Sequence, residues 1–218
     1  MSIRKFKYII VGGGIVAGYA AQEFIKHPEY KAGDLAIVTD DDAIPYERPP
    51  LSKDFLAGEE NYEDIQINAP EFYRKNGIQL FLYTRVNQVN ASDKTISTDH
   101  GDVFGYEKLL LATGSSPVRF DSSGSGHTLI KYLRTVEDAR AIRNRFDKSN
   151  HIVVIGGGYI GMETAAVLTG DGHHVTMVFP DNRLMERLFT PQLSQYFEAY
   201  YQNHGVTFVK GATVDEFE

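Results

Sequence analysis

The 218-residue sequence contains no cysteine. Without a thiol, the chain cannot supply a thiolate nucleophile, a structural zinc cluster or a dithiol relay. Long apolar runs are also missing: the run that follows the N-terminal basic residues, YIIV, has four residues before glycine interrupts it. Such a run is too short for a signal peptide or a membrane span. We therefore expect a cytoplasmic protein without a membrane partner.

Positive charge is in deficit. The formal net charge is −7 and the pI is near 5.5, so most of the surface would repel the phosphates of a nucleic acid. With 42% hydrophobic and 23% charged residues, the composition is typical of a globular protein of one or two domains. The seven histidines are scattered, and only His173 and His174 are adjacent, without a carboxylate at ligand spacing. We expect neither a nucleic-acid partner nor a metal site.

One internal repeat stands out against this background. YIIVGGGIVAGYAA occupies residues 8–21 and IVVIGGGYIGMETAA occupies residues 152–166. Each copy has an apolar, β-branched run, then three glycines, then a pattern of small residues with helical spacing. This order predicts a strand, a tight turn and a helix, twice in one chain.

The spacing of small residues in each copy is that of a dinucleotide-binding turn. The first position lets the chain turn sharply, the second leaves room for a pyrophosphate, and the third lets the helix pack closely on the strand. Free amides at the helix start then face the phosphates. The three positions are Gly12, Gly14 and Ala17 in the first copy, and Gly156, Gly158 and Gly161 in the second.

Each turn should be followed by a second strand that ends near an acid for the adenosine ribose. After the first turn, LAIVTDDD places Asp40 there, with Asp41 as the alternative. After the second, Phe179 occupies the usual acid position and Asp181 follows two residues later. A solvated acidic turn in the first case, and a turn residue in the second, are the simpler interpretations. Two such sites predict two nucleotides, FAD and NAD(P)H.

The segment between the two copies predicts the rest of the architecture. Residues 78–114 alternate in short stretches separated by turn residues, as in an antiparallel meander, and end in the small turn Ala112-Thr113-Gly114. The Ser/Gly-rich stretch 120–128 predicts a domain boundary. We therefore expect an α/β protein of two Rossmann-like, three-layer units, the first with a meander insertion. The FAD-binding domain would span residues 1–119 and the NAD(P)H-binding domain residues 120–218.

The stretch IPYERPPLSKDF, residues 44–55, packs an arginine, a serine and a lysine around two prolines that fix the backbone. With both glycine turns, RPPLSK and ATG in this order, the chain resembles the FAD-dependent pyridine nucleotide oxidoreductases. Within them it is most similar to the group of monodehydroascorbate reductases, ferredoxin and rubredoxin reductases and apoptosis-inducing factor. The resemblance covers nearly the whole sequence.

The resemblance implies a role for each matched position. Arg48 and Lys53 would offer cations to the flavin, held in place by the prolines between them. On the FAD side, the matched positions are Gly12 and Gly14 for the phosphates, Asp40 for the ribose, and Thr113 and Gly114 for the turn that abuts FAD. On the nicotinamide side, the positions that match those facing the nicotinamide nucleotide are Gly156, Gly158, Tyr159, Gly161 and Asp181.

Lys53 and Glu163 are the catalytic residues that the resemblance implies. Hydride arrival makes the flavin anionic, so a nearby lysine ammonium would stabilise the product and the transition state. A glutamate paired with the lysine would fix its direction and offset its desolvation. We expect the two groups within salt-bridge distance, or about one water apart if no cofactor is bound, with Glu163 in the first turn of its helix.

The activity implied is hydride transfer from NADH, in preference to NADPH, to FAD. Relatives that reduce disulfides carry a CxxxxC pair where this sequence has RPPLSKD, so electrons would pass directly to an acceptor. That acceptor would be monodehydroascorbate or a small ferredoxin- or rubredoxin-type protein. The alternatives are a redox sensor or scaffold, like apoptosis-inducing factor, and a silent truncated product. The resemblance also implies further sequence after residue 218, including a surface for a homodimer.

Overall fold

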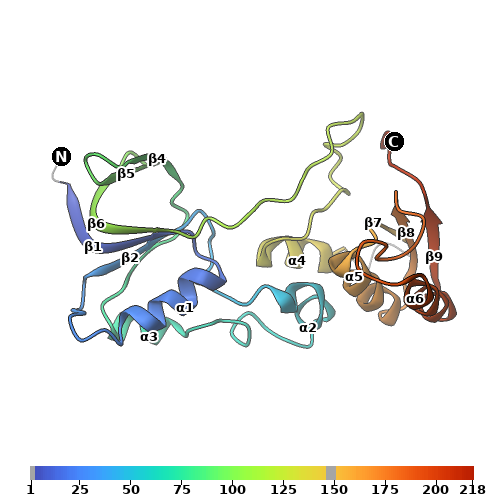
Figure 1. Ribbon diagram of the computed structural model, residues 1–218, viewed down its shortest axis with the longest axis horizontal. Helices are drawn as coiled ribbons and strands as arrows, with labels where there is room; N and C mark the ends of the chain where they lie inside the picture. The colour runs from blue at the N-terminus through green and yellow to red at the C-terminus, as the bar shows by residue number, and fades with distance from the viewer. Residues whose placement is uncertain (1–2, 146–150) are drawn as a thin grey trace. The chain divides into compact units, whose positions relative to one another are not determined.

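The computed structural model describes residues 3–145 and 151–218, and the chain divides into two compact units (Figure 1). The first unit comprises Met1–Arg48 and Tyr62–Ser116, and the second comprises Pro49–Asn61 and Pro117–Glu218. The chain passes from one unit to the other between Ser116 and Pro117, close to the division expected from the sequence. Pro49–Asn61, which the sequence places in the first domain, packs with the second unit instead.

The first unit is built on one mixed sheet in the order β3-β2-β1-β6-β5-β4. Strands β3, β2, β1 and β6 run parallel, whereas β6, β5 and β4 pair antiparallel. The strands are β1 (Arg4–Val11), β2 (Leu35–Val38), β3 (Gln79–Phe81), β4 (Val86–Asn90), β5 (Thr95–Thr98) and β6 (Val103–Leu111). The expected antiparallel meander is therefore β4–β6.

The stretch at 79–81, also expected in the meander, pairs instead in parallel with β2 at the edge of the sheet. The reason is the helix α3 (Pro70–Lys75), which returns the chain to the start of the sheet before β3. A crossover through a helix produces a parallel pair. Short apolar alternation alone does not distinguish the two pairings.

Two apolar layers hold the first unit together. Ile10, Leu35 and Ile37 face α1 (Ile15–Phe24) and α3, whose Ala17 and Tyr73 join the same buried cluster. A second cluster contains Phe6, Val38, Ile96 and Phe104, and it joins the parallel strands to the meander. Figure 1 shows α1 and α3 on one side of the parallel strands, and β4 and β5 on the other side. The three layers are thus the helices, the parallel strands including β6, and the pair β4–β5.

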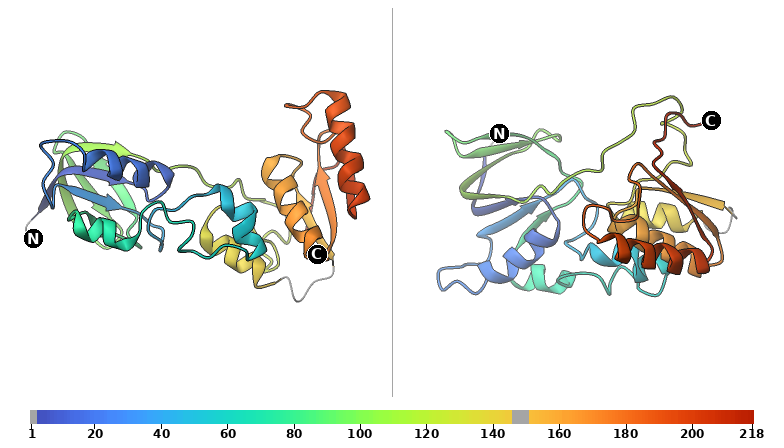
Figure 2. Two further views of the ribbon diagram at one scale, coloured as in Figure 1. Left: turned by 90° about the horizontal axis from the view of Figure 1, so that it is seen from below. Right: turned by 45° about the vertical axis from the view of Figure 1, so that its right-hand side comes forward.

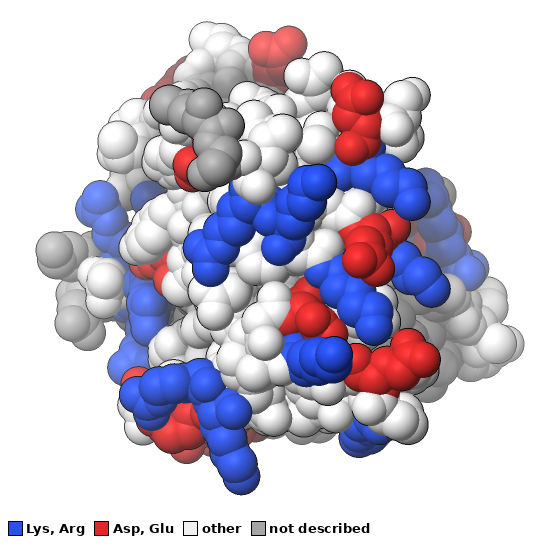
Figure 3. All heavy atoms as spheres, turned by 90° about the vertical axis from the view of Figure 1, so that its left-hand side faces the viewer, with Lys and Arg blue, Asp and Glu red and all other residues white. Residues whose placement is uncertain are grey.

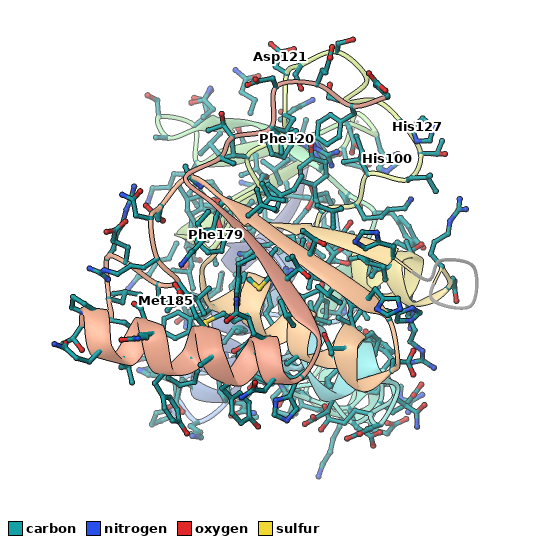
Figure 4. All side chains as sticks on the ribbon, turned by 90° about the vertical axis from the view of Figure 1, so that its right-hand side faces the viewer. His100, Phe120, Asp121, His127, Phe179 and Met185 are labelled. Carbon is teal, nitrogen blue, oxygen red and sulfur yellow. The ribbon has the colours of Figure 1, made fainter. Side chains whose placement is uncertain are left out.

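The second unit contains a parallel sheet in the order β7-β8-β9. Its elements are β7 (His151–Ile155), α5 (Tyr159–Gly170), β8 (His174–Phe179), α6 (Pro191–Asn203) and β9 (Val206–Lys210). Helices α5 and α6 lie on the same side of this sheet (Figure 2; Figure 4). The order strand, helix, strand, helix, strand confirms the Rossmann-like pattern that the second glycine repeat predicts.

The segment Pro49–Asn61 forms the turn η1 (Pro49–Ser52) and the short helix α2 (Asp54–Ala57). Phe55 and Leu56 are buried, and α2 contacts α4 (Val136–Arg143) and α5. Helix α4 begins with a capping box in which Thr135 and Asp138 each accept from the other's backbone amide. Burial of these apolar side chains explains why the segment belongs to the second unit.

Figure 3 shows the side of the molecule that lies on the left in Figure 1. Lysine and arginine side chains on this side are mixed with aspartate and glutamate.

Within the described ranges, 3–145 and 151–218, none of the helices combines the length and apolarity that a membrane crossing requires. The same residues contain no group of three or more histidine or carboxylate side chains that could hold a metal ion.

Candidate functional site

The first glycine turn joins β1 to α1 in the first unit. Gly12 has φ +112°, and a Cβ built on it would lie 2.1 Å from the carbonyl oxygen of Ala112. The Gly12 amide donates to Val38 at 2.8 Å, and the Ala112 amide donates to Val11 at 2.8 Å. Gly12 is therefore required by the fold itself, because it sits tightly between β2 and β6.

Gly14 differs from Gly12. It is the N-cap of α1, in an extended conformation with φ −87° and without a side-chain capping bond. A Cβ at Gly14 would meet only the Arg48 guanidinium, at 3.7 and 3.8 Å. The first amides of a helix have no partner within it, and the helix start attracts anions. Open space, free amides and a guanidinium fit the pyrophosphate of a dinucleotide.

Arg48 is held beside this turn by two neighbours from its own loop. Its Nη1 donates to the Tyr46 hydroxyl at 3.3 Å, and its Nη2 lies 3.7 Å from Asp41 Oδ2. The fully buried Tyr46 hydroxyl donates to the same Asp41 oxygen at 3.1 Å. Sequence reasoning identified Arg48 but missed Tyr46, since no pattern marks a tyrosine two residues before an arginine as its support.

Burial raises the pKa of the Asp41 carboxyl above 3.8, although the Tyr46 hydroxyl and the Arg48 guanidinium act in the opposite direction. A raised pKa means that the folded state holds the proton at a pH where the unfolded state has lost it. Stability contributed by this group is thus present at low pH and is lost as the pH rises through the folded pKa.

We therefore expect Asp41→Asn to gain stability relative to the unaltered protein as the pH rises from about 3 to 7. The measurement is the denaturant midpoint of both proteins across this range. Asp121→Asn, the same change at an exposed residue, is the control. A difference that stays flat or falls with pH would contradict the direction of the shift.

The ribose acids can be compared through the register of the two units. The Gly12 amide bonds to Val38, and the Gly156 amide bonds to Val178. Counting onward from these equivalent residues, Asp41 corresponds to Asp181, whereas Asp40 corresponds to a proline. The Asp40 carboxylate pairs with Arg85 at 2.8 Å on the surface. This register aligns Asp41, the alternative candidate, with Asp181, while the ribose roles of Asp40, Asp41 and Asp181 all stay predictions.

Thr113 and Gly114 come after β6 and Ala112, and both are exposed. Gly114 has φ +67°, which glycine tolerates without strain. Because Ala112 touches Gly12 and Arg48 lies beside Gly14, the predicted residues of the first unit converge where β1 and β6 end. β1 and β6 are parallel neighbours, so their carboxyl ends lie side by side, and the carboxyl ends of such strands are the usual ligand position in these sheets. Ala17 packs in the core below.

The second glycine turn repeats this arrangement in the second unit. Gly156 has φ +125°, and a Cβ on Gly156 or Gly158 would meet no atom within 4 Å. A Cβ on Gly161 would lie 2.1 Å from the Gly156 carbonyl oxygen, so the third glycine allows close packing, as predicted. Tyr159 begins α5 and is 58% exposed, and its role toward a nicotinamide stays a prediction.

Phe179, at the usual acid position, is buried beneath this turn. Its ring lies 2.8 Å from a Cβ built on Gly157, and it packs edge-on against Phe208. Phe179 and Met185 lie at the same end of the sheet (Figure 4), and the Met185 amide donates to the Gly157 carbonyl at 3.2 Å. Phe179 therefore belongs to the core, and Asp181 is left as the candidate acid.

Lys53 and Glu163 form the predicted ion pair inside the second unit, with Nζ 2.9 Å from Oε2. Lys53 Nζ also donates to the Pro49 carbonyl at 3.1 Å. Glu163 is the fifth residue of α5, so it lies in the second turn and not in the first as expected. The distance is confirmed, whereas the catalytic role of the pair stays a prediction.

Two further residues accompany Glu163 that the sequence did not indicate: Ser52 bonds to it, and Tyr201 lines the same groove. Ser52 Oγ donates to Glu163 Oε2 at 2.5 Å. Burial, and after it the negative charge of Glu163, raises the pKa of the Tyr201 phenol, so Tyr201 stays protonated and donates to the Met162 carbonyl at 3.2 Å. Lys53, Glu163 and Tyr201 line an open groove of about 540 Å³ beside α2 and α5.

Comparison with known proteins agrees with this arrangement. The family model described as pyridine nucleotide-disulphide oxidoreductase matches residues 6–218. The chain is 41% identical to a peroxisomal monodehydroascorbate reductase of Oryza sativa subsp. japonica, over 99% of this chain and 48% of the relative. It is 39% identical to a monodehydroascorbate reductase of Pisum sativum, over 99% of this chain and 53% of the relative. The chain spans about half the length of the curated relatives it matches.

Solved structures resemble the fold over the same extent. A chain in the covalent putidaredoxin reductase–putidaredoxin complex superposes with a TM-score of 0.89 at 33% identity, over 100% of this chain and 52% of that chain. The ferredoxin reductase of the CYP199A2 system from Rhodopseudomonas palustris gives a TM-score of 0.88 at 28% identity, over 97% of this chain and 52% of that chain.

Proposed function

The chain belongs to the pyridine nucleotide-disulphide oxidoreductase family, and from this we propose that its protein transfers a hydride from NADH to FAD and passes the electrons directly to an acceptor. One observation carries the proposal: each unit has a glycine turn at a helix start whose second glycine opens onto free space. Two such turns in one chain suit two dinucleotides. When bound, FAD supplies the hydride-accepting ring, and the chain supplies position and electrostatic field.

We assign FAD to the first unit. The helix start at Gly14 and the Arg48 guanidinium would hold the pyrophosphate, and Asp40 or Asp41 would accept hydrogen bonds from the ribose. Thr113 and Gly114 would approach the cofactor through their backbone. In the second unit, the Lys53 ammonium would stabilise the negative charge that develops on hydride arrival, with Glu163 fixing its direction.

We assign the nicotinamide nucleotide to the second unit, with its pyrophosphate at Gly156 and Gly158. Asp181 would accept bonds from the ribose hydroxyls and repel a 2′-phosphate. Arg183, which could otherwise attract that phosphate, is bonded within its own loop, to the carbonyls of Phe189 at 3.0 Å and Glu186 at 2.9 Å. These bonds support NADH as the preferred nucleotide.

We therefore expect kcat/KM for NADH to exceed that for NADPH by about tenfold or more. The reason is that repulsion between the Asp181 carboxylate and the 2′-phosphate of NADPH would weaken binding by about that factor or more. Asp181→Ala should narrow the ratio. Asp171→Ala, which removes an exposed carboxylate at the other end of α5, is the control and should leave the ratio unchanged. A preference of the unaltered protein for NADPH would refute the assignment.

The acceptor we propose is monodehydroascorbate or a small ferredoxin- or rubredoxin-type protein. The sequence has no cysteine to relay electrons, and the relatives are named monodehydroascorbate reductases while a structural neighbour is a reductase bound to putidaredoxin. NADH oxidation should speed up on addition of one of these acceptors. Stimulation by a disulfide substrate alone would refute direct transfer. We also propose that the protein is cytoplasmic. The rice relative is named as peroxisomal, so cell fractionation is the test that separates the two locations.

A further inference from the structure

Ser52, the hydroxyl residue of the proline-stiffened loop, has no role in the proposed function, yet it has a specific partner. It is only 5% exposed, and its Oγ lies 2.5 Å from Glu163 Oε2. The other nearby acceptor, the Pro49 carbonyl oxygen, is at 3.5 Å. A serine hydroxyl has one proton to donate, and hydroxyl bonds are strongest near 2.7 Å. The proton therefore points to Glu163.

Ser52 and Lys53 converge on one carboxylate oxygen. Lys53 Nζ is 2.9 Å from Glu163 Oε2 and 3.1 Å from the Pro49 carbonyl. Side chains of successive residues usually diverge, but Ser52 ends the turn η1 and Lys53 has φ −129° and ψ −119° as the N-cap of α2. The prolines at 49 and 50 have fixed φ angles, so the loop presents both groups to the same oxygen with little freedom.

The two contacts differ in rigidity. The Lys53 side chain is long and 43% exposed, and an exposed ion pair alone fixes neither partner well. Ser52 is buried and has a single rotatable bond before its oxygen, so its hydrogen bond defines where the carboxylate lies. A hydrogen bond to a charged acceptor is also stronger than one to a neutral acceptor.

We propose that Ser52 is a positioning residue, which fixes the Glu163 carboxylate and through it the direction of the Lys53 ammonium. The consequence for hydride transfer rests on the proposed function. The coupling between Ser52 and Glu163 does not, because their hydrogen bond joins two side chains of the chain itself. The two parts can therefore be tested apart.

The first test is a double-mutant cycle on the denaturant unfolding of the full chain without cofactor. Ser52→Ala should lower the unfolding midpoint. In a Glu163→Ala background, the Ser52 hydroxyl is a buried donor without its acceptor, which is costly, so Ser52→Ala should leave the midpoint unchanged or raise it. Thr169→Val is the control: its hydroxyl donates to Ala165 within α5, and its effect should be equal in both backgrounds. Equal effects of Ser52→Ala in both backgrounds would overturn the inference.

The second test uses the FAD-loaded protein and rapid mixing with saturating NADH. Ser52→Ala should slow flavin reduction by about 3- to 10-fold, the factor that corresponds to one hydrogen bond, while the Kd for NADH stays the same. In the Glu163→Ala background it should add no further loss. An additive loss, or an effect on Kd alone, would overturn the positioning role. If NADH does not reduce the unaltered protein, the proposed function fails, and the unfolding cycle still decides the coupling.

Discussion

Gly14→Val is expected to yield a protein that no longer takes up FAD but keeps its fold. A Cβ added at this position would meet only the end of the Arg48 side chain within 4 Å, and the backbone there is extended, with φ −87°. The valine methyl groups would fill the space that the pyrophosphate needs, at the start of α1. After incubation with FAD and gel filtration, the visible flavin absorption should be absent while the far-UV circular dichroism matches the unaltered protein.

Two other glycines serve as controls for this result. Gly158→Val, at the equivalent place in the second unit, also enters open space and should retain FAD but lose NADH binding. Gly12→Val is a different case. A Cβ at Gly12 would lie 2.1 Å from the carbonyl oxygen of Ala112, and we therefore expect this variant to disrupt the fold itself. The sequence alone predicts the same outcome for Gly12 and Gly14. A fully yellow Gly14→Val protein would refute the assignment of this turn to FAD.

Lys53→Met is the second large effect we expect: FAD stays bound, but reduction by NADH slows by at least about tenfold. One preorganised charge that acts on a developing negative charge contributes about this much. Methionine keeps a similar length and removes the ammonium, so the loss reports charge more than packing. The rate constant for flavin reduction at saturating NADH, measured by rapid mixing, is the relevant quantity.

Lys210→Met is the matched control for Lys53→Met. Lys210 also lies in the second unit, is paired with a glutamate, Glu198, at 2.8 Å, and has a similar exposure of 39%. It is not one of the predicted site residues, so its replacement should leave the reduction rate at saturating NADH unchanged. An unchanged rate in Lys53→Met, or equal losses in both variants, would remove the Lys53–Glu163 pair from the mechanism.

The parts of the molecule that the sequence predicts best are those set by local chemistry. The two glycine turns, their strands and helices and the open second glycine follow from short-range rules on φ angles and close packing. The antiparallel pairing of β4–β6 follows from alternation and turn residues. The ion pair between Lys53 and Glu163 was predicted through the resemblance, not through spacing.

Other features depend on contacts that no local pattern encodes. The segment Pro49–Asn61 packs with the second unit because Phe55 and Leu56 find their buried contacts there. Ser52 meets Glu163 across 111 positions in sequence. Arg183 resembles a phosphate ligand in the sequence, yet it is bonded to the carbonyls of its own loop. In each case tertiary packing decides the role of the side chain.

Anaerobic titration of the FAD-loaded protein with NADH, followed by visible absorption, tests the central claim that one chain brings both nucleotides to one reaction. The account predicts rapid bleaching of the bound flavin, slower bleaching in Lys53→Met and no bleaching in Gly158→Val. Slow bleaching with a long-lived charge-transfer band in the unaltered protein would indicate a redox sensor instead. Bound flavin that stays oxidised in excess NADH would contradict the account.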